Sequence, residues 1–116
     1  MRHTGQHIKA LGRMKQGTMN KTESRYALHL EQLKTHGSVL WWKFEGLKFR
    51  LADSTFYTPD FSVHMDTGEV ELHEVKGSKA IMEDDAWAKL KIAADLYPFK
   101  FKLIIPKGQL WTTQEI

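Results

Sequence analysis

The sequence has no cysteine among its 116 residues and no long apolar run. Without thiols the chain can form neither disulfide bonds nor zinc sites built on thiolates, which suits the reducing cytoplasm. No stretch approaches the roughly 20 apolar residues that a membrane-spanning helix needs. The N-terminal residues also lack the pattern of a secretory signal. We therefore expect a cytoplasmic protein without a membrane partner.

Acidic residues are absent from the first 22 positions, although the chain contains 14 of them. This segment carries a charge of +5 and three glycines, whereas the remaining residues carry −2. Such a segment is typical of a flexible arm that binds phosphate groups, although a loose terminus without function is the alternative. The candidate phosphate-binding residues of this arm are Arg2, Lys9, Arg13 and Lys15.

The composition outside the arm indicates one packed domain. The chain is 41% apolar and contains four tryptophans, which is enough for one core and too little for two domains. We therefore expect an arm over residues 1–19 and a single globular domain over residues 20–116.

A first helix is predicted over residues 21–36. Asn20 and Glu23 have the spacing of a capping box, and Gly37 can provide the left-handed residue that ends the helix. Apolar residues recur with helical period at Tyr26, Leu30 and Leu33. Glu23 lies at the end of this stripe, so its carboxylate should point toward the core.

Alternating or β-branched segments predict the strands that follow. We expect two strands on either side of Glu45-Gly46, over residues 39–44 and 47–51. We also expect a hairpin, with strands over residues 57–63 and 71–76 and a glycine turn at 66–68.

In the favoured register of this hairpin, Met65 faces Glu69, and Asp60 therefore lies opposite Glu74 with Cβ atoms about 5 Å apart. Lys76 follows on the same face of the strand, and His73 points to the other face.

A second helix should begin at Ser78 or at Asp84-Asp85 and end before Pro98. Its apolar stripe is Trp87, Leu90, Ala94 and Tyr97. Residues 99–105 alternate as a further strand, which Pro106 should end. The connection has the length of a right-handed crossover, so this strand should run parallel to residues 71–76. The predicted class is α/β (α+β); residues 107–116 have no assigned element.

Two carboxylates that face each other repel unless a positive charge lies between them. Asp60 and Glu74 offer only oxygen ligands, which favour magnesium over zinc, and Lys76 could stabilise charge on a phosphate. The alternative is an ordinary surface ion pair between Glu74 and Lys76. The inward carboxylate of Glu23 favours the metal site. The histidines at 29, 36, 64 and 73 lack the spacing of a zinc site.

The chain contains Pro59-Asp60 and, after thirteen further residues, Glu74-Val75-Lys76. This order resembles the signature of the PD-(D/E)xK nucleases. The longer string "YTPDF…EVKG" is most similar to the phage junction-resolving endonucleases of this superfamily. The resemblance covers roughly residues 23–105 and implies a restriction-endonuclease-like core of a helix, a three-stranded antiparallel meander, a helix and a fourth strand parallel to the third. The chain departs from these relatives in its longer hairpin and in the little sequence after the fourth strand.

The resemblance also implies roles for individual residues. Asp60 and Glu74 would bind Mg²⁺, for which Mn²⁺ can substitute, and Val75 would add its backbone carbonyl. Glu23 would complete the metal shell, and Lys76 would hold the attacking water or the phosphate. Among the basic residues outside the arm, Lys79 is a further candidate for DNA contact.

The implied function is a magnesium-dependent DNA endonuclease, a resolvase of branched DNA such as Holliday junctions, that acts as a homodimer. A C₂ dimer would supply the two active sites that paired cuts require. The alternatives are a restriction-like or single-strand-specific nuclease, and a binding module of the same fold without catalysis. The intact set of two acids and a lysine favours the enzyme, because a pure binding protein has no need of a repulsive pair.

Overall fold

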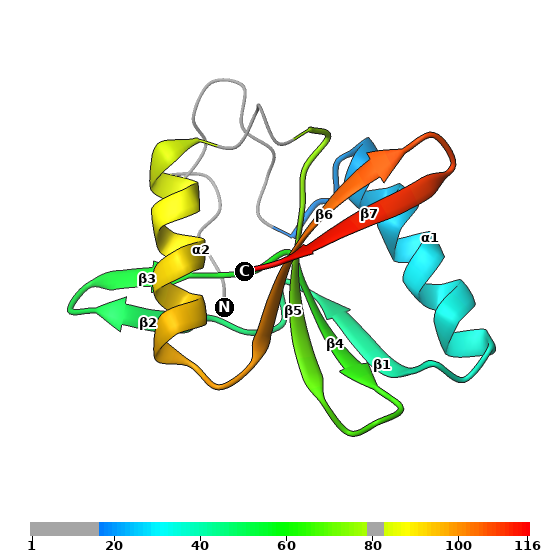
Figure 1. Cartoon of the computed structure of the whole chain (residues 1–116), viewed down its shortest axis with the longest axis horizontal. Coiled ribbons are helices and arrows are strands. Elements are labelled where there is room, and N and C mark those ends of the chain that lie inside the picture. The colour runs from blue at the N-terminus through cyan, green and yellow to red at the C-terminus, as the bar shows by residue number, and fades with distance from the viewer. Residues whose placement is uncertain (1–16, 79–82) are drawn as a thin grey trace.

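Two helices and a mixed five-stranded sheet form most of the described part of the chain, residues 17–78 and 83–116 of a computed structural model (Figure 1). The strand order in the large sheet is β1-β4-β5-β6-β7, and β2 and β3 form a separate two-stranded sheet. The elements are α1 (Lys21–Thr35), β1 (Val39–Phe44), β2 (Phe49–Ala52), β3 (Thr55–Tyr57), β4 (Phe61–Met65), β5 (Val70–Val75), α2 (Asp84–Leu96), β6 (Lys100–Lys107) and β7 (Leu110–Glu115). The protein is therefore an α+β fold.

The ends of α1 are fixed as the sequence predicts. The Asn20 side chain accepts from the Glu23 amide at 2.8 Å, and the Glu23 carboxylate accepts from the Asn20 amide at 2.9 Å, so the capping box is complete. At the other end Gly37 has φ +90° and its amide donates to the Lys34 carbonyl. The caps fix the two ends of the helix, and its apolar stripe meets the sheet, where Tyr26 and Leu30 are buried.

The hairpin of β4 and β5 has the predicted register. Phe61 pairs with His73 and Val63 with Glu71, and the turn is closed by a bond from the Met65 amide to the Glu69 carbonyl. Continued by one residue, this register places Asp60 beside Glu74. β6 pairs parallel with β5, so this predicted relationship is confirmed. β1 pairs antiparallel with β4, a pairing that the sequence did not specify.

The segment predicted as a strand over 47–51 belongs to a different sheet from its neighbours. β2 pairs with β3 rather than with the large sheet, and Tyr57 ends β3 instead of beginning the next strand. Glu45, with φ +51° directly after β1, accounts for the change of direction, and Ser54, with φ +58°, makes the turn between β2 and β3. The prediction of a strand over 57–63 is corrected to β4, which begins at Phe61.

The C-terminal region contains one strand that the sequence did not predict. β6 continues through Pro106, and β7 pairs antiparallel with it, so the expectation that Pro106 ends the strand was wrong. β5 ends at Val75, opposite Ile104. Pro106 lies beyond this last pair, where its missing N–H leaves no bond to β5 unmade.

Two hydrophobic cores lie on opposite faces of the large sheet. One contains Tyr26 and Leu30 of α1 with Val75 and Ile104 of the sheet. The other is built between α2, the β2–β3 hairpin and the opposite sheet face, with these fully or nearly buried residues: Phe49, Tyr57, Leu72, Leu90, Ala93, Phe101 and Leu103. Ala94 of the predicted stripe packs against this core, and Ala93, which was not predicted, is fully buried within it. Within the described residues, neither helix has the length and apolarity needed to cross a membrane.

Candidate acidic active site

Asp60 and Glu74 lie at adjacent strand ends and are both almost completely buried, with exposed fractions of 9% and 7%. Asp60 immediately precedes β4, where its carbonyl accepts from the Glu45 amide at 2.7 Å. Its carboxylate accepts from the Val75 amide through Oδ2 at 2.8 Å. This bond ties the Asp60 side chain across to β5, next to Glu74. The two carboxylates predicted from the sequence are therefore brought together by the hairpin register.

Each oxygen of Glu74 has its own neighbour. The Tyr57 hydroxyl donates to Oε1 at 2.6 Å, and the Lys76 ammonium lies 3.5 Å from Oε2. Tyr57 reaches this position from β3, in the smaller sheet, and is itself buried. Sequence reasoning did not identify Tyr57 as part of the site. Its place three residues before Asp60, within the same short string, was the available signal.

The electrostatics of the pair are unfavourable for two negative charges. Burial raises the pKa of Asp60 well above its usual range, and the nearby Glu74 carboxylate raises it further. Burial also raises the pKa of Glu74, although the Tyr57 hydroxyl and the Lys76 ammonium partly oppose this effect. One ammonium group therefore faces two buried carboxylates and does not balance them.

Two further glutamates lie near this pair. The Glu23 carboxylate raises the pKa of Asp60, so the predicted fourth acid lies within electrostatic range of the site. It does not point into the core as predicted, because its Oε1 accepts from the Asn20 amide in the capping box and the side chain is only half-buried. Glu45 is a residue that the sequence reasoning missed: it is half-buried, its Oε1 accepts from the Gly17 amide at 3.0 Å, and burial raises its pKa, with Glu23 adding to the shift. Its position at the turn between β1 and the small sheet gave no signal in the sequence.

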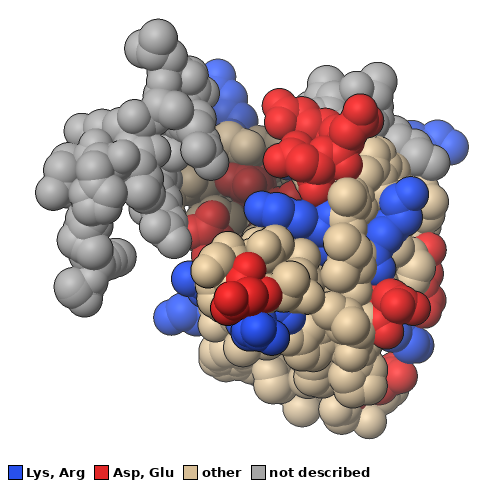
Figure 2. Space-filling model, turned by 90° about the vertical axis from the view of Figure 1, so that its left-hand side faces the viewer, with Lys and Arg blue, Asp and Glu red and all other residues tan. Residues whose placement is uncertain are grey.

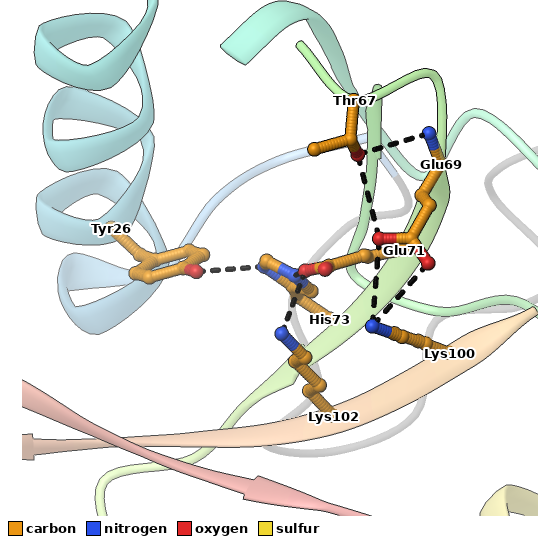
Figure 3. Close-up of polar contacts among 7 residues, drawn as sticks. All are labelled: Tyr26, Thr67, Glu69, Glu71, His73, Lys100 and Lys102. Atoms are coloured by element: carbon orange, nitrogen blue, oxygen red, sulfur yellow. Dashed lines mark hydrogen bonds and ion pairs between the residues drawn. The ribbon is translucent and has the colours of Figure 1, made fainter. Parts of the chain in front are cut away.

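A different carboxylate on β5 shows how this chain neutralises a buried acid. Glu71 points to the opposite sheet face, where its Oε1 lies 2.9 Å from His73 Nε2 and 3.0 Å from the Lys102 ammonium (Figure 3). These contacts, that of His73 first, lower the pKa of Glu71 to about 2. The Tyr26 hydroxyl lies 2.7 Å from His73 Nδ1 and completes the network. As predicted, His73 faces away from Glu74.

Among the described residues, the Asp60–Glu74 pair lacks the charged partners that neutralise Glu71. Burial of Asp60 and Glu74 without equivalent partners is the environment that a divalent cation would relieve. No three acidic or histidine side chains are grouped to hold an ion over residues 17–78 and 83–116. Two carboxylates nevertheless suit magnesium, which keeps several of its waters when it binds proteins. The donor set therefore fits a magnesium or manganese ion.

The predicted DNA-contacting residues fall outside the described part of the chain: Arg2, Lys9, Arg13, Lys15 and Lys79. Val75, the predicted carbonyl ligand of the metal, donates its amide to Asp60 at 2.8 Å and buries its side chain in the core beneath α1. On the face drawn in Figure 2, acidic side chains are visible within a hollow, and both acidic and basic side chains lie around it.

Comparisons of the chain with protein-family models, with curated proteins and with solved structures gave no match. The geometry of the acidic site therefore carries the functional proposal.

Proposed function

We propose that the protein is a metal-dependent DNA endonuclease with the active site of the PD-(D/E)xK superfamily, and that it cuts branched DNA. The observation that supports this most strongly is the buried Asp60–Glu74 pair, whose pKa values are raised although the Lys76 ammonium lies 3.5 Å from Glu74. Retaining such a pair costs stability. A metal-dependent reaction gives the chain a reason to keep it.

The fold supports the same proposal. The elements follow one another in the order of a restriction-endonuclease-like core: a helix, the antiparallel strands β1, β4 and β5, a second helix and the parallel strand β6. In that core the acidic residues lie on the hairpin that precedes the second helix. Asp60 and Glu74 occupy the corresponding ends of β4 and β5.

The residues would divide the work as follows. Asp60 and Glu74 would hold the magnesium ion, with Glu23 adjusting its shell from the first turn of α1. When bound, the ion would neutralise phosphate charge and lower the pKa of a water. Lys76 would orient the attacking water or stabilise charge on the phosphate through its ammonium group. Tyr57 would keep the Glu74 carboxylate in one orientation.

Branched DNA is the proposed substrate and a homodimer the proposed assembly. One site of this kind cuts one strand, so paired cuts at a branch require two sites, which a two-fold axis supplies. The arm over residues 1–19 would add phosphate contacts that do not depend on sequence.

A cleavage assay tests this function. The protein is incubated with magnesium and matched linear, flap, single-stranded and four-way DNA, and we expect nicks near the branch of the four-way substrate. Asp60→Asn and Glu74→Gln should each reduce the rate about a hundredfold or more. Glu71→Gln, which alters a buried carboxylate on the opposite sheet face, is the matched control and should cut normally. Full activity in chelator, or in the Glu74 variant, contradicts the proposal.

The same assay separates the alternatives. Equal cutting of linear and four-way DNA would favour a restriction-like enzyme, and preference for unpaired DNA a single-strand-specific one. Binding without cutting in any metal would favour the non-catalytic module.

A further inference from the structure

A groove lies between α1 and β7, on the sheet face opposite Glu74. Its volume is about 440 Å³, which falls within the range of small-ligand sites. The side chains that form it come from one face of the helix and from the β6–β7 hairpin, and besides Leu110 they are Tyr26, His29, Gln32, Gln109, Trp111 and Thr113. A smaller hollow of about 180 Å³, which adds Arg25, shares four of these residues and extends the groove. The acidic site uses none of them.

An aromatic ring and a guanidinium group form one end of this groove. Trp111 packs edge-to-face on Tyr26, with ring centroids 4.9 Å apart, and is thereby fixed against the core. The Arg25 guanidinium lies 5.0 Å from the centroid of the Trp111 ring and donates to the Gly108 carbonyl at 3.2 Å. A tryptophan beside an arginine is the combination that single-strand binding proteins use for bases and phosphates.

The hydrogen-bonding groups of the groove suit a planar polar ligand. No described residue is hydrogen-bonded to the side-chain amides of Gln32 or Gln109, and each amide offers both a donor and an acceptor. Burial, with His73 as a smaller cause, lowers the pKa of His29, so its ring is neutral at neutral pH and also offers both.

The charge of the groove favours an anion. The described residues that line it include no aspartate or glutamate, and Arg25 is a permanent cation. A ligand with a flat hydrogen-bonding ring and a negative charge would complement the aromatic ring, the amides and the guanidinium group of the groove.

We infer that this groove binds an unpaired nucleotide of a DNA strand, with the base against Trp111 and the glutamine amides and the phosphate near Arg25. The choice of DNA rests on the proposed nuclease function. A duplex cannot place a base there, because its bases are paired and stacked inside the helix. Glu23 of the acidic site and Gln32 of the groove are nine residues apart on α1, about 14 Å along the helix axis. A strand that passes along α1 could therefore reach both.

This arrangement gives the protein a means to select branched or flapped DNA. A substrate with an unpaired nucleotide near the cleaved bond would fill the groove, and a linear duplex would leave it empty. The selection would come from the base and not from the phosphates, which both substrates share.

Equilibrium binding in chelator tests the inference without any need for cleavage. The affinities of the whole protein are measured by fluorescence anisotropy for a labelled oligothymidine, an abasic oligomer of the same length and a duplex. We expect Gln32→Ala and Gln109→Ala each to weaken oligothymidine binding about tenfold and to leave the other two affinities unchanged. Gln114→Ala, an exposed glutamine on β7 outside the groove, is the matched control and should bind like the wild type.

Two results would overturn the inference. An equal weakening for oligothymidine and for the abasic oligomer would show that the groove binds phosphate alone. Unchanged affinity for all three probes would show that nucleic acid does not occupy it and would leave a protein segment as the occupant. Neither result bears on the Asp60 and Glu74 variants in the cleavage assay. Conversely, base-dependent binding by a protein that never cuts DNA would reject the nuclease proposal and keep the groove.

Discussion

The Tyr57 hydroxyl donates to Glu74 Oε1 at 2.6 Å, although the two residues belong to different sheets. Both side chains are buried, and hydrogen bonds to a carboxylate in such surroundings are short and strong. The bond holds the carboxylate from the side of the β2–β3 hairpin, while Lys76 approaches its other oxygen. The small sheet is therefore a part of the acidic site.

Tyr57→Phe should weaken metal binding without unfolding the protein. Without the hydroxyl the Glu74 carboxylate is free to rotate, and removal of such an orienting partner typically costs 10–100-fold in metal affinity. We expect the Mn²⁺ concentration for half-saturation to rise about tenfold in a calorimetric titration, with cleavage largely restored at saturating Mn²⁺.

Tyr97→Phe is the matched control for this variant. The hydroxyl of Tyr97, at the end of α2, also donates at 2.6 Å, but to the Arg50 carbonyl of β2. Its removal should leave Mn²⁺ affinity unchanged. If both tyrosine variants lose metal affinity equally, the effect comes from general loosening of the second core and the orienting role of Tyr57 is wrong.

Asp60→Asn should stabilise the protein at neutral pH in chelator while it abolishes cleavage. The folded-state pKa of Asp60 is raised, so the charged carboxylate destabilises the fold as pH rises above about 4, where the unfolded-state group ionises. Below that pH both states are protonated and the cost is absent. The urea midpoint of the variant should exceed that of the wild type at pH 8, and the difference should shrink toward pH 4. A lower midpoint at pH 8 would mean that Asp60 already has a sufficient partner.

Mg²⁺ or Mn²⁺ should raise the melting temperature of the wild-type protein. A ligand that binds only the folded state stabilises it by about 2.7 kcal/mol at a hundred times its dissociation constant. For a domain of this size we expect a shift of several degrees. The shift should vanish in Glu74→Gln and persist in Glu71→Gln. Equal shifts in both variants would place the ion elsewhere.

Local sequence signals predicted the parts of the site that lie within one hairpin and one helix cap. The period-two pattern and the turn at Gly68 fix the β4–β5 register, and this register brings Asp60 to Glu74. The capping box places Glu23 in the first turn of α1.

Tyr57 could not be placed in the same way, because its bond to Glu74 depends on β2 and β3 leaving the large sheet. The sequence could not predict the change of direction at Glu45, because a glutamate with a left-handed backbone conformation is uncommon. β7 was missed because a proline usually ends a strand. Only the structure shows that Pro106 lies past the last residue of β6 that pairs with β5.

Deletion of residues 1–19 should weaken DNA binding by the same factor for different sequences. The deletion removes four basic residues, and the salt slope of the binding constant should fall by about 0.9 for each phosphate that the arm neutralises in the wild type. Affinities measured across a salt series for two unrelated duplexes test this. A slope that stays at the wild-type value would mean that the arm does not bind phosphates.

Glu71→Gln should make the protein less stable at neutral pH and nearly equal to the wild type in acid. His73 and Lys102 hold the folded-state pKa of Glu71 at about 2, below the unfolded value of about 4.3. Such a depressed pKa contributes stability that is present above the unfolded value and is lost as pH falls toward the folded one. The unfolding free energies of the two proteins, measured by urea titration, should therefore converge between about pH 4 and pH 2. Because the pKa of Asp60 is shifted in the opposite direction, the Asp60→Asn variant should differ from the wild type with the opposite sign, and its difference should already be absent at about pH 4. If the unfolding free energies of the two variants depended on pH in the same way, the carboxylates on the two faces of β5 would not differ in how their charges are neutralised.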